Sequence, residues 1–170
     1  NEMVYQMPRI FPEGDKTDNL VIQVNANYKN SGQITIMSDV IPDLHCDGDS
    51  QCFPLYLYEK TENDTIDFGS SGDLFAEKAT AKSEEGYTRK DGISDAGLAH
   101  FQQHYTSEII SKEDVFYYVY GLLHSPDYRA RYAANLSKEL PRMPCVKTAK
   151  DFWHFSQAGR DLAQLHIHYE

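Results

Sequence analysis

The sequence predicts an α+β fold, in which a small antiparallel β-sheet in the N-terminal part packs against a C-terminal helical bundle. Strand signals and turn residues gather in residues 1–60, whereas capping residues followed by apolar residues at helical spacing gather in residues 92–170. Between them, residues 61–91 are polar and have the composition of a surface insertion. We therefore expect a single domain over residues 1–170, built from these three parts.

Two strands are expected at residues 20–25 and 33–38, where β-branched residues roughly alternate with polar ones. The turn residues 30–32 between them, Asn-Ser-Gly, favour a hairpin. Residues 53–59 predict another strand. Pro54 must lie at its start or at a sheet edge, because proline cannot donate a backbone hydrogen bond.

Capping residues predict where the helices begin. Four hydroxyl side chains precede helical patterns, at Ser94, Ser111, Ser125 and Thr148, and Asp95 is an alternative cap for the first of these helices. Ser111 is followed three residues later by Asp114, which makes a capping box, and the helix after it is apolar or aromatic on nearly every side. Pro141 and Pro144 predict an extended link before the last helix. One face of that last helix is expected to carry Phe152, Phe155, Gly159, Leu162 and His166.

Charge gives a mixed indication of the partner. The formal net charge of −10 is unusual for a nucleic-acid-binding module, because such a module usually has a basic surface. Residues 125–150 are different, because six cations face only Asp127 and Glu139, which gives 6 − 2 = +4. The six cations are Arg129, Arg131, Lys138, Arg142, Lys147 and Lys150.

Catalytic motifs are missing from the sequence. It has no glycine-rich phosphate loop with Lys-Ser or Lys-Thr, no glycine-rich methyl-donor loop and no Asn-Pro-Pro-aromatic motif. The acid-X-Lys element that a metal nuclease needs is also absent. His100 and His104 are spaced as zinc ligands on a helix can be, but the Glu of the zinc protease motif does not follow the first His. We expect neither catalysis nor a metal site in this chain.

Compartment is indicated by what the sequence contains. It has three cysteines, a sparse and odd number that argues against a disulfide framework. No apolar run is long enough to span a membrane, and no secretory signal is visible at the start. We expect a cytoplasmic protein with no membrane contact.

Six ordered segments, which together span nearly the whole chain, carry a resemblance to a known family. They are Asn1 to Pro12, Gln51 to Tyr58, Gly92 to Asp95, Glu113 to Tyr132, Leu140 to Pro144 and Asp151 to Glu170. They resemble the C-terminal specificity region of type ISP restriction-modification enzymes, single-chain bacterial machines with nuclease, helicase, methyltransferase and target-recognition parts. The resemblance implies that this chain recognises double-stranded DNA as a target-recognition domain.

The resemblance also implies what the rest of such a polypeptide would hold. Helicase, nuclease and adenine-type methyltransferase parts would lie upstream, and they would use ATP, Mg and S-adenosylmethionine. None of these cofactors is expected in this chain. Its partners would be double-stranded DNA and the methyltransferase and helicase parts.

Three clusters are candidates for DNA contact, because arginine reads guanine, amides read adenine, and lysine and arginine hold phosphates. The first is the expected hairpin tip, with Asn27, Lys29 and Asn30. The second is a predicted loop at 86–91, with Tyr87, Arg89 and Lys90. The six cations of residues 125–150 form the third. On the loop, Arg89 is expected either to read a guanine or to pair with Asp91 or Glu85 at the surface.

Two further functions stay open from the sequence. The chain could be a structural coupling module that contacts other parts of the same enzyme and touches DNA little, which the negative net charge favours. An acidic mimic of DNA is a weaker hypothesis. It would need a dense helical stripe of carboxylates, whereas many of the acidic residues lie in the polar insertion.

Overall fold

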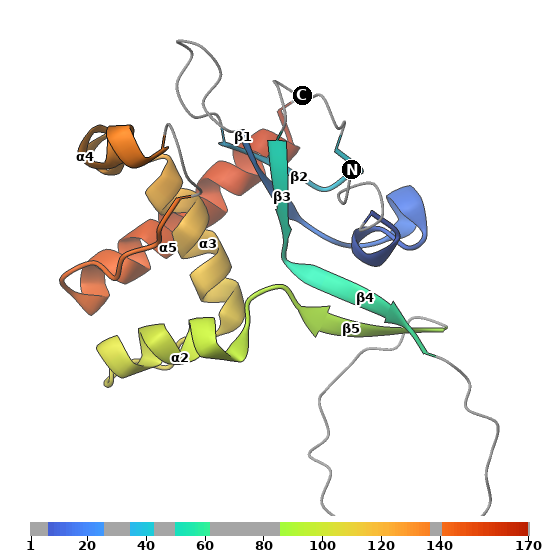
Figure 1. Cartoon of the computed structure of the whole chain (residues 1–170), viewed down its shortest axis with the longest axis horizontal. Coiled ribbons are helices and arrows are strands. Elements are labelled where there is room, and N and C mark those ends of the chain that lie inside the picture. Colours follow the sequence, from blue (N-terminus) through green and yellow to red (C-terminus); the bar gives the residue numbers. More distant parts are fainter. Residues whose placement is uncertain (1–6, 26–34, 43–49, 62–85, 137–140, 170) are drawn as a thin grey trace, which may run out of the picture.

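The computed structural model describes residues 7–25, 35–42, 50–61, 86–136 and 141–169 (Figure 1). The strands are β1 (Val21–Asn25), β2 (Thr35–Ser38), β3 (Ser50–Pro54), β4 (Tyr56–Lys60) and β5 (Tyr87–Asp91). The helices are η1 (Gly14–Lys16, a 3-10 helix), α2 (Asp95–His104), α3 (Lys112–Leu123), α4 (Pro126–Leu136) and α5 (Ala149–Ile167). Small antiparallel sheets are thus followed by helices, which confirms the predicted α+β class.

The first sheet is three-stranded, with the order β2-β1-β3 and antiparallel pairing on both sides of β1. Every residue of β1 is buried, which its central position explains. Ile22 pairs with Met37 on one side and with Phe53 on the other, so these three side chains share a face of the sheet. The pairing of β1 with β2 confirms the predicted hairpin, while its turn lies outside the described residues.

The single strand predicted over 53–59 was wrong, because the chain changes sheets at Leu55. The Leu55 amide donates to the carbonyl of Leu20, and the Leu55 carbonyl accepts from the amide of Gly92. A Cβ atom on Gly92 would lie 2.0 Å from the carbonyl oxygen of Pro54, so only glycine allows this close approach. Pro54 ends β3, where its missing amide hydrogen costs little.

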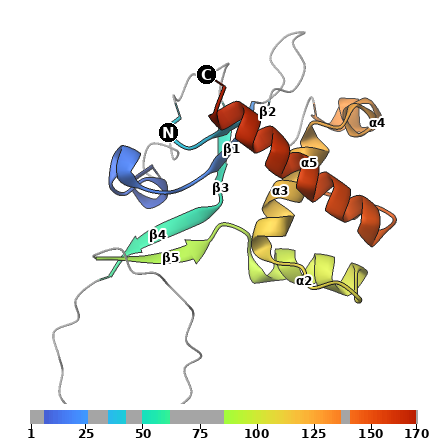
Figure 2. The ribbon, with the colours of Figure 1, turned by 180° about the vertical axis from the view of Figure 1, so that it is seen from behind.

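The second sheet is a two-stranded antiparallel ribbon of β4 and β5. Residues 87–91 were predicted to lie on a loop, and this prediction was wrong because they pair with β4 over its whole length. In Figures 1 and 2 the ribbon extends away from α4 and α5. The segment before β1 covers part of it, since Asn19 donates to the Tyr56 carbonyl and the Tyr58 hydroxyl donates to the Asp18 carbonyl.

Three helices, α2, α3 and α5, begin directly after the residues predicted to cap them. Ser94 caps α2, Ser111 and Asp114 form the capping box of α3, and Thr148 caps α5. Eight residues of α3 are buried, in agreement with a helix that is apolar on nearly every side. This helix packs mainly against α5 and is the centre of the helical part.

The buried face of α5 differs in part from the predicted one. It carries Phe152, Ser156, Gly159 and Ala163, whereas Phe155 and Leu162 are half-buried and His166 is exposed. Ser156 is tolerated in the core because its hydroxyl donates to the carbonyl of Asp114 at 3.0 Å. The small residues let α5 approach α3 closely, which a purely apolar pattern does not reveal.

Aromatic side chains hold the extended link 141–146 in place. The hydroxyls of Tyr105, Tyr118 and Tyr128 donate to the carbonyls of Val146, Pro144 and Arg142, at 2.7, 2.5 and 2.8 Å. The ring of Tyr118 also stacks on the ring of Phe152, with their centroids 4.8 Å apart. The C-cap residue of α2 and two helices, α3 and α4, thus fix a segment that has no regular structure of its own.

Candidate nucleic-acid interface

The β4–β5 ribbon places the second predicted cluster on a defined surface. Tyr58 pairs directly with Arg89, and Tyr56 with Asp91, so these four side chains share a face. Arg89 is half-buried, and its guanidinium carbon lies 4.1 Å from the centre of the Tyr56 ring. Stacking of this kind is favourable, because the face of an aromatic ring is negative.

The surface pair of Arg89 with Asp91, one of the two alternatives predicted for Arg89, is not formed. Asp91 instead forms an ion pair with Lys112, with 3.2 Å between the ammonium nitrogen and the carboxylate oxygen. The same lysine forms a second ion pair with Asp95 at 2.6 Å. This arrangement holds the start of α2 beside the end of β5. Glu85, the other predicted partner of Arg89, lies outside the described residues.

Lys90 has a carboxylate partner and Tyr87 is half-buried at the start of β5. The carboxylate of Glu59 lies 2.6 Å from the Lys90 ammonium and 3.0 Å from the Arg9 guanidinium. The hydrogen bond from Lys90, with the charge of Arg9, lowers the pKa of Glu59 below its ordinary value. Lys90 is therefore partly neutralised, although its side chain remains exposed and can still meet a phosphate.

The cations of the basic segment, residues 125–150, differ in their burial and in their contacts. Arg129 is half-buried, and its Nε donates to the Leu123 carbonyl at 2.6 Å, which caps the end of α3. Arg131 is exposed, with its guanidinium 5.8 Å from the Tyr132 ring centre. The exposed cations of the link and of the start of α5 are Arg142, Lys147 and Lys150.

Four of the predicted contact residues lie outside the described part of the chain. They are Asn27, Lys29, Asn30 and Lys138. Among the described residues, Tyr87, Arg89 and Lys90 lie together on β5 of the ribbon. The cations of the basic segment lie on α4, on the link and on α5. Sequence reasoning missed Tyr56, because its stacking on Arg89 depends on a strand pairing between segments about thirty residues apart.

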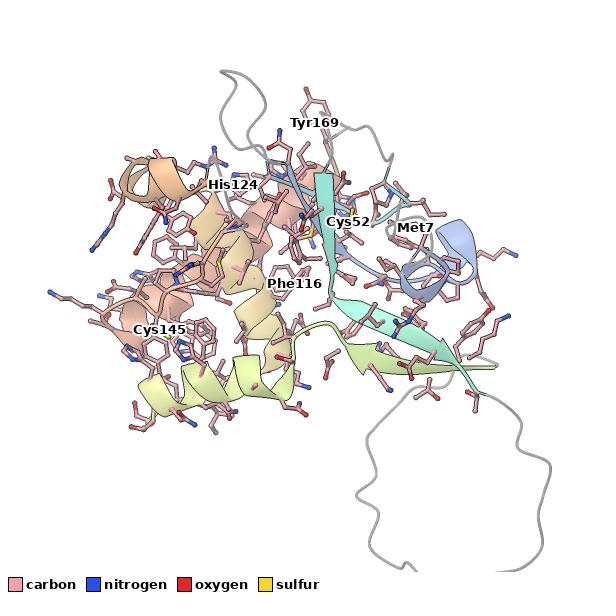
Figure 3. The ribbon with its side chains drawn as sticks, in the orientation of Figure 1. Met7, Cys52, Phe116, His124, Cys145 and Tyr169 are labelled. Atoms are coloured by element: carbon pink, nitrogen blue, oxygen red, sulfur yellow. The ribbon has the colours of Figure 1, made fainter. Side chains whose placement is uncertain are left out.

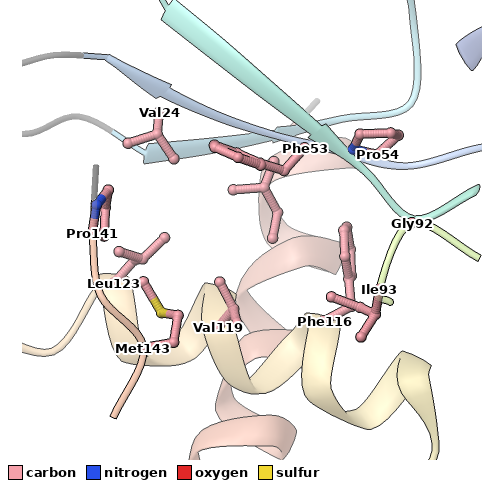
Figure 4. Close-up of a pocket in the computed structure, with 11 residues that line it drawn as sticks. Val24, Phe53, Pro54, Gly92, Ile93, Phe116, Val119, Leu123, Pro141 and Met143 are labelled. Carbon is pink, nitrogen blue, oxygen red and sulfur yellow. The ribbon is translucent and has the colours of Figure 1, made fainter. Parts of the chain in front are cut away.

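A cavity of about 270 Å³ lies between the three-stranded sheet and α3 (Figure 4). Val24 and Phe53 line it from the sheet, and Val119 and Leu123 line it from α3. Phe116 lies between α3 and the sheet in the same region (Figure 3). Among the described residues that line the cavity, none carries a titratable or nucleophilic side chain.

Within the described residues, no group of three or more His, Cys, Asp or Glu side chains is arranged to hold a metal ion. No helix in that part of the chain is both long enough and apolar enough to cross a bilayer.

Residues 1–170 match the model of one protein family, the type ISP C-terminal specificity domain. A domain of this kind belongs to the recognition part of restriction enzymes. The chain is a member of this family, which confirms the resemblance seen in its sequence. The comparison with curated proteins found no match.

The solved structures that are similar to the chain include two complexes. One is the cryo-EM structure of a DrdV–DNA complex, with 34% identity and a TM-score of 0.72, over 95% of this chain and 13% of that one. The other is a nuclease-deletion mutant of the type ISP restriction-modification enzyme LlaGI in complex with a DNA substrate mimic, with 28% identity and a TM-score of 0.64. It covers 97% of this chain and 11% of that one. The chain thus corresponds to a small share of both larger polypeptides.

Proposed function

We propose that this chain recognises a specific sequence of double-stranded DNA, as the specificity domain of a restriction-modification enzyme. The observation that carries the proposal is the match to the specificity-domain family over residues 1–170. Both similar structures contain DNA or a DNA mimic, which supports DNA as the partner. The exposed cations Arg131, Lys147 and Lys150 and the ribbon residue Arg89 supply the side-chain types that DNA contact requires.

The proposal extends to the larger enzyme. Helicase, nuclease and adenine-type methyltransferase parts would lie in the same polypeptide and use ATP, Mg and S-adenosylmethionine, in the cytoplasm. The chain itself would have no catalytic activity, because it would supply the choice of target and leave the chemistry to the other parts. Methyl transfer, ATP hydrolysis or DNA cleavage by the purified 170-residue chain would contradict this role.

A structural coupling role is the second candidate. The formal charge of −10 opposes DNA binding, and several large apolar side chains are exposed. Among them, Ile109 is 96% exposed and Leu165 is 65% exposed. In this role the domain would pack against neighbouring parts of the enzyme and contact DNA little.

Footprinting of DNA distinguishes the two functions. The larger enzyme would be compared with a version that lacks this domain, on the same DNA fragment. Recognition predicts a footprint at a defined sequence that disappears with the domain. A footprint at the same sequence without the domain would contradict the recognition role and favour coupling.

A further inference from the structure

The cations around the β4–β5 ribbon differ in whether a carboxylate neutralises them. Arg9 and Lys90 both contact Glu59. Lys112 contacts Asp91 and Asp95. Over the part of the chain that the structure describes, the side chain of Arg89 makes no hydrogen bond and no ion pair, and its guanidinium lies over the Tyr56 ring. Arg89 is therefore a cation of the ribbon whose hydrogen-bonding edge is unused within those residues.

A second arginine in the same structure shows what a stacked guanidinium looks like when its role is structural. The guanidinium of Arg160 lies 4.2 Å from the centre of the Tyr117 ring, almost the same separation as in the Arg89 pair. However, its two terminal nitrogens donate to Glu113 at 2.7 Å and to Asp114 at 2.8 Å. Arg160 thus joins α5 to the start of α3. Arg89 also lies over a tyrosine ring, but no carboxylate accepts a hydrogen bond from its guanidinium within the described residues.

Stacking determines which part of Arg89 a ligand can reach. The ring covers one side of the guanidinium, and the N–H groups of the guanidinium remain available to a ligand on its other sides. That fork matches the two acceptors of a guanine, O6 and N7, in the major groove of DNA. The ring also restricts the long side chain before binding, so less conformational entropy is lost on contact.

The ribbon has the dimensions that such a contact needs. Two paired strands lie about 4.8 Å apart, and the major groove, about 12 Å wide, admits a two-stranded β-ribbon. β4 and β5 form a sheet of their own and extend away from α4 and α5 (Figures 1 and 2). Glu59, an acidic residue of β4, is already paired with two cations, which reduces its repulsion of phosphates.

We propose that the β4–β5 ribbon enters the major groove and that Arg89, held over the Tyr56 ring, reads one guanine of the recognised sequence. This inference rests on the proposed function and specifies its reading element. Arg89 contacts the base, and Tyr56 is a positioning residue that acts through Arg89. Lys90, with its partner Glu59, lies one residue further along the strand and does not share this face.

The experiment uses the larger enzyme, with nuclease activity suppressed by omitting Mg. Its preferred sequence is first selected from random DNA duplexes. Affinity is then measured for that sequence and for each single-base variant of it. If the unaltered enzyme has no preference, the proposed function fails before any substitution is examined. If it has a preference, the variants of Arg89 and Tyr56 test the further inference alone.

Arg89→Ala is expected to abolish the preference for guanine at one base pair, with a loss of about 5- to 150-fold in affinity for the preferred sequence. Tyr56→Leu, which keeps an apolar side chain but removes the ring, should weaken the preference at that same base pair. Tyr56→Phe keeps the ring and should restore it. An unchanged profile for Arg89→Ala would overturn the reading role. An equal loss on every sequence would also overturn it, because phosphate contact gives that result.

Two controls keep the result interpretable. Lys16→Ala removes an exposed cation from η1 and should leave the profile unchanged. A change in the DNA avoids any effect on folding: 7-deazaguanine at the proposed position removes the N7 acceptor. It should weaken binding by the unaltered enzyme and have no effect on Arg89→Ala. If both enzymes respond equally to 7-deazaguanine, Arg89 does not read that base.

Discussion

A Cβ atom on Gly121 of α3 would lie 3.0 Å from the amide nitrogen of Gly159 in α5 and 2.1 Å from the carbonyl oxygen of Phe155. The relationship is reciprocal, since a Cβ atom on Gly159 would lie 2.0 Å from the carbonyl oxygen of Tyr117. The two helices therefore cross with their backbones in contact. This crossing holds the centre of the helical part together.

Gly121→Ala is expected to destabilise the domain by about 1–3 kcal/mol or more, because the backbones of α3 and α5 must separate to admit a methyl group. Gly97→Ala in α2 is the matched control. Its Cβ would meet two side chains, the Ser94 hydroxyl at 3.3 Å and Ile93 at 3.6 Å, and alanine favours a helix over glycine. Urea unfolding of the 170-residue chain measures both. Equal stability for Gly121→Ala and the unaltered chain would contradict a tight crossing.

The capping box of α3 gives a second prediction. The Ser111 hydroxyl accepts from the Asp114 amide at 3.1 Å, and the Asp114 carboxylate accepts from the Ser111 amide at 2.9 Å. Ser111→Ala should cost about 0.5–2 kcal/mol in the free energy of unfolding. Ser107→Ala, which changes a serine of the turn before α3, is the comparison. A cost no larger than that of Ser107→Ala would show that the cap is not needed.

Asp114 makes this stabilisation depend on pH. Burial raises the pKa of Asp114, but hydrogen bonds from Ser111 and Arg160 outweigh burial, so the pKa lies below the ordinary value of 3.8. The folded state therefore favours the carboxylate, and its contribution is present above about pH 4 and is lost as the pH falls below it. Asp114→Asn should be less stable at neutral pH and lose less stability on acidification. A parallel loss in both proteins would contradict the assignment.

His124 predicts a second pH dependence at higher pH. Burial, with the charges of Arg129 and His166, lowers the pKa of His124 from 6.5 to about 4. Between these values the unfolded chain binds a proton that the folded chain does not, so stability falls as the pH decreases from 6.5 towards 4. The loss is at most about 1.4 kcal/mol per pH unit. His124→Gln should flatten this dependence, whereas His154→Gln, at an exposed position of α5, should not. Identical profiles for the two variants would exclude His124 as the cause.

Salt dependence distinguishes phosphate contacts from structural cations. If Lys147 and Lys150 hold phosphates, replacing either with Ala should flatten the plot of log affinity against log salt by about one unit, similarly for all sequences. The same prediction stands for Lys138. Arg129→Ala should instead lower the stability of the domain by about 1 kcal/mol, because the Leu123 carbonyl loses its donor. DNA binding in the larger enzyme and urea unfolding measure the two effects. A slope unchanged in all three lysine variants would make these lysines ordinary surface residues.

Local signals in the sequence were enough to place the helices and the first hairpin. Ser94, Ser111 and Thr148 cap helices because a hydroxyl and the following amides lie within one turn, and neighbouring residues determine that geometry. The same holds for β1 and β2, where alternation and a turn lie close together. Elements whose structure depends on distant residues were predicted less well.

The β4–β5 ribbon is an element that local sequence signals do not predict. Residues 87–91 have no apolar alternation, and they form a strand because β4 offers a partner across a gap of more than twenty residues. The change of sheet at Leu55 likewise depends on Leu20 and Gly92, which are distant in sequence. Tyr56 therefore could not be assigned as the support of Arg89 before the strand pairing was known. The family was visible from the sequence because its motifs are local and ordered.

The central claim is that this chain chooses a DNA sequence. Selection of bound duplexes from a random pool by the larger enzyme, with and without the domain, tests it most directly. We expect one enriched sequence with the domain and none without it, and each mismatched base pair in that sequence should cost about 1–3 kcal/mol of binding free energy. Enrichment that is absent with the domain, or identical without it, would contradict sequence recognition by this chain.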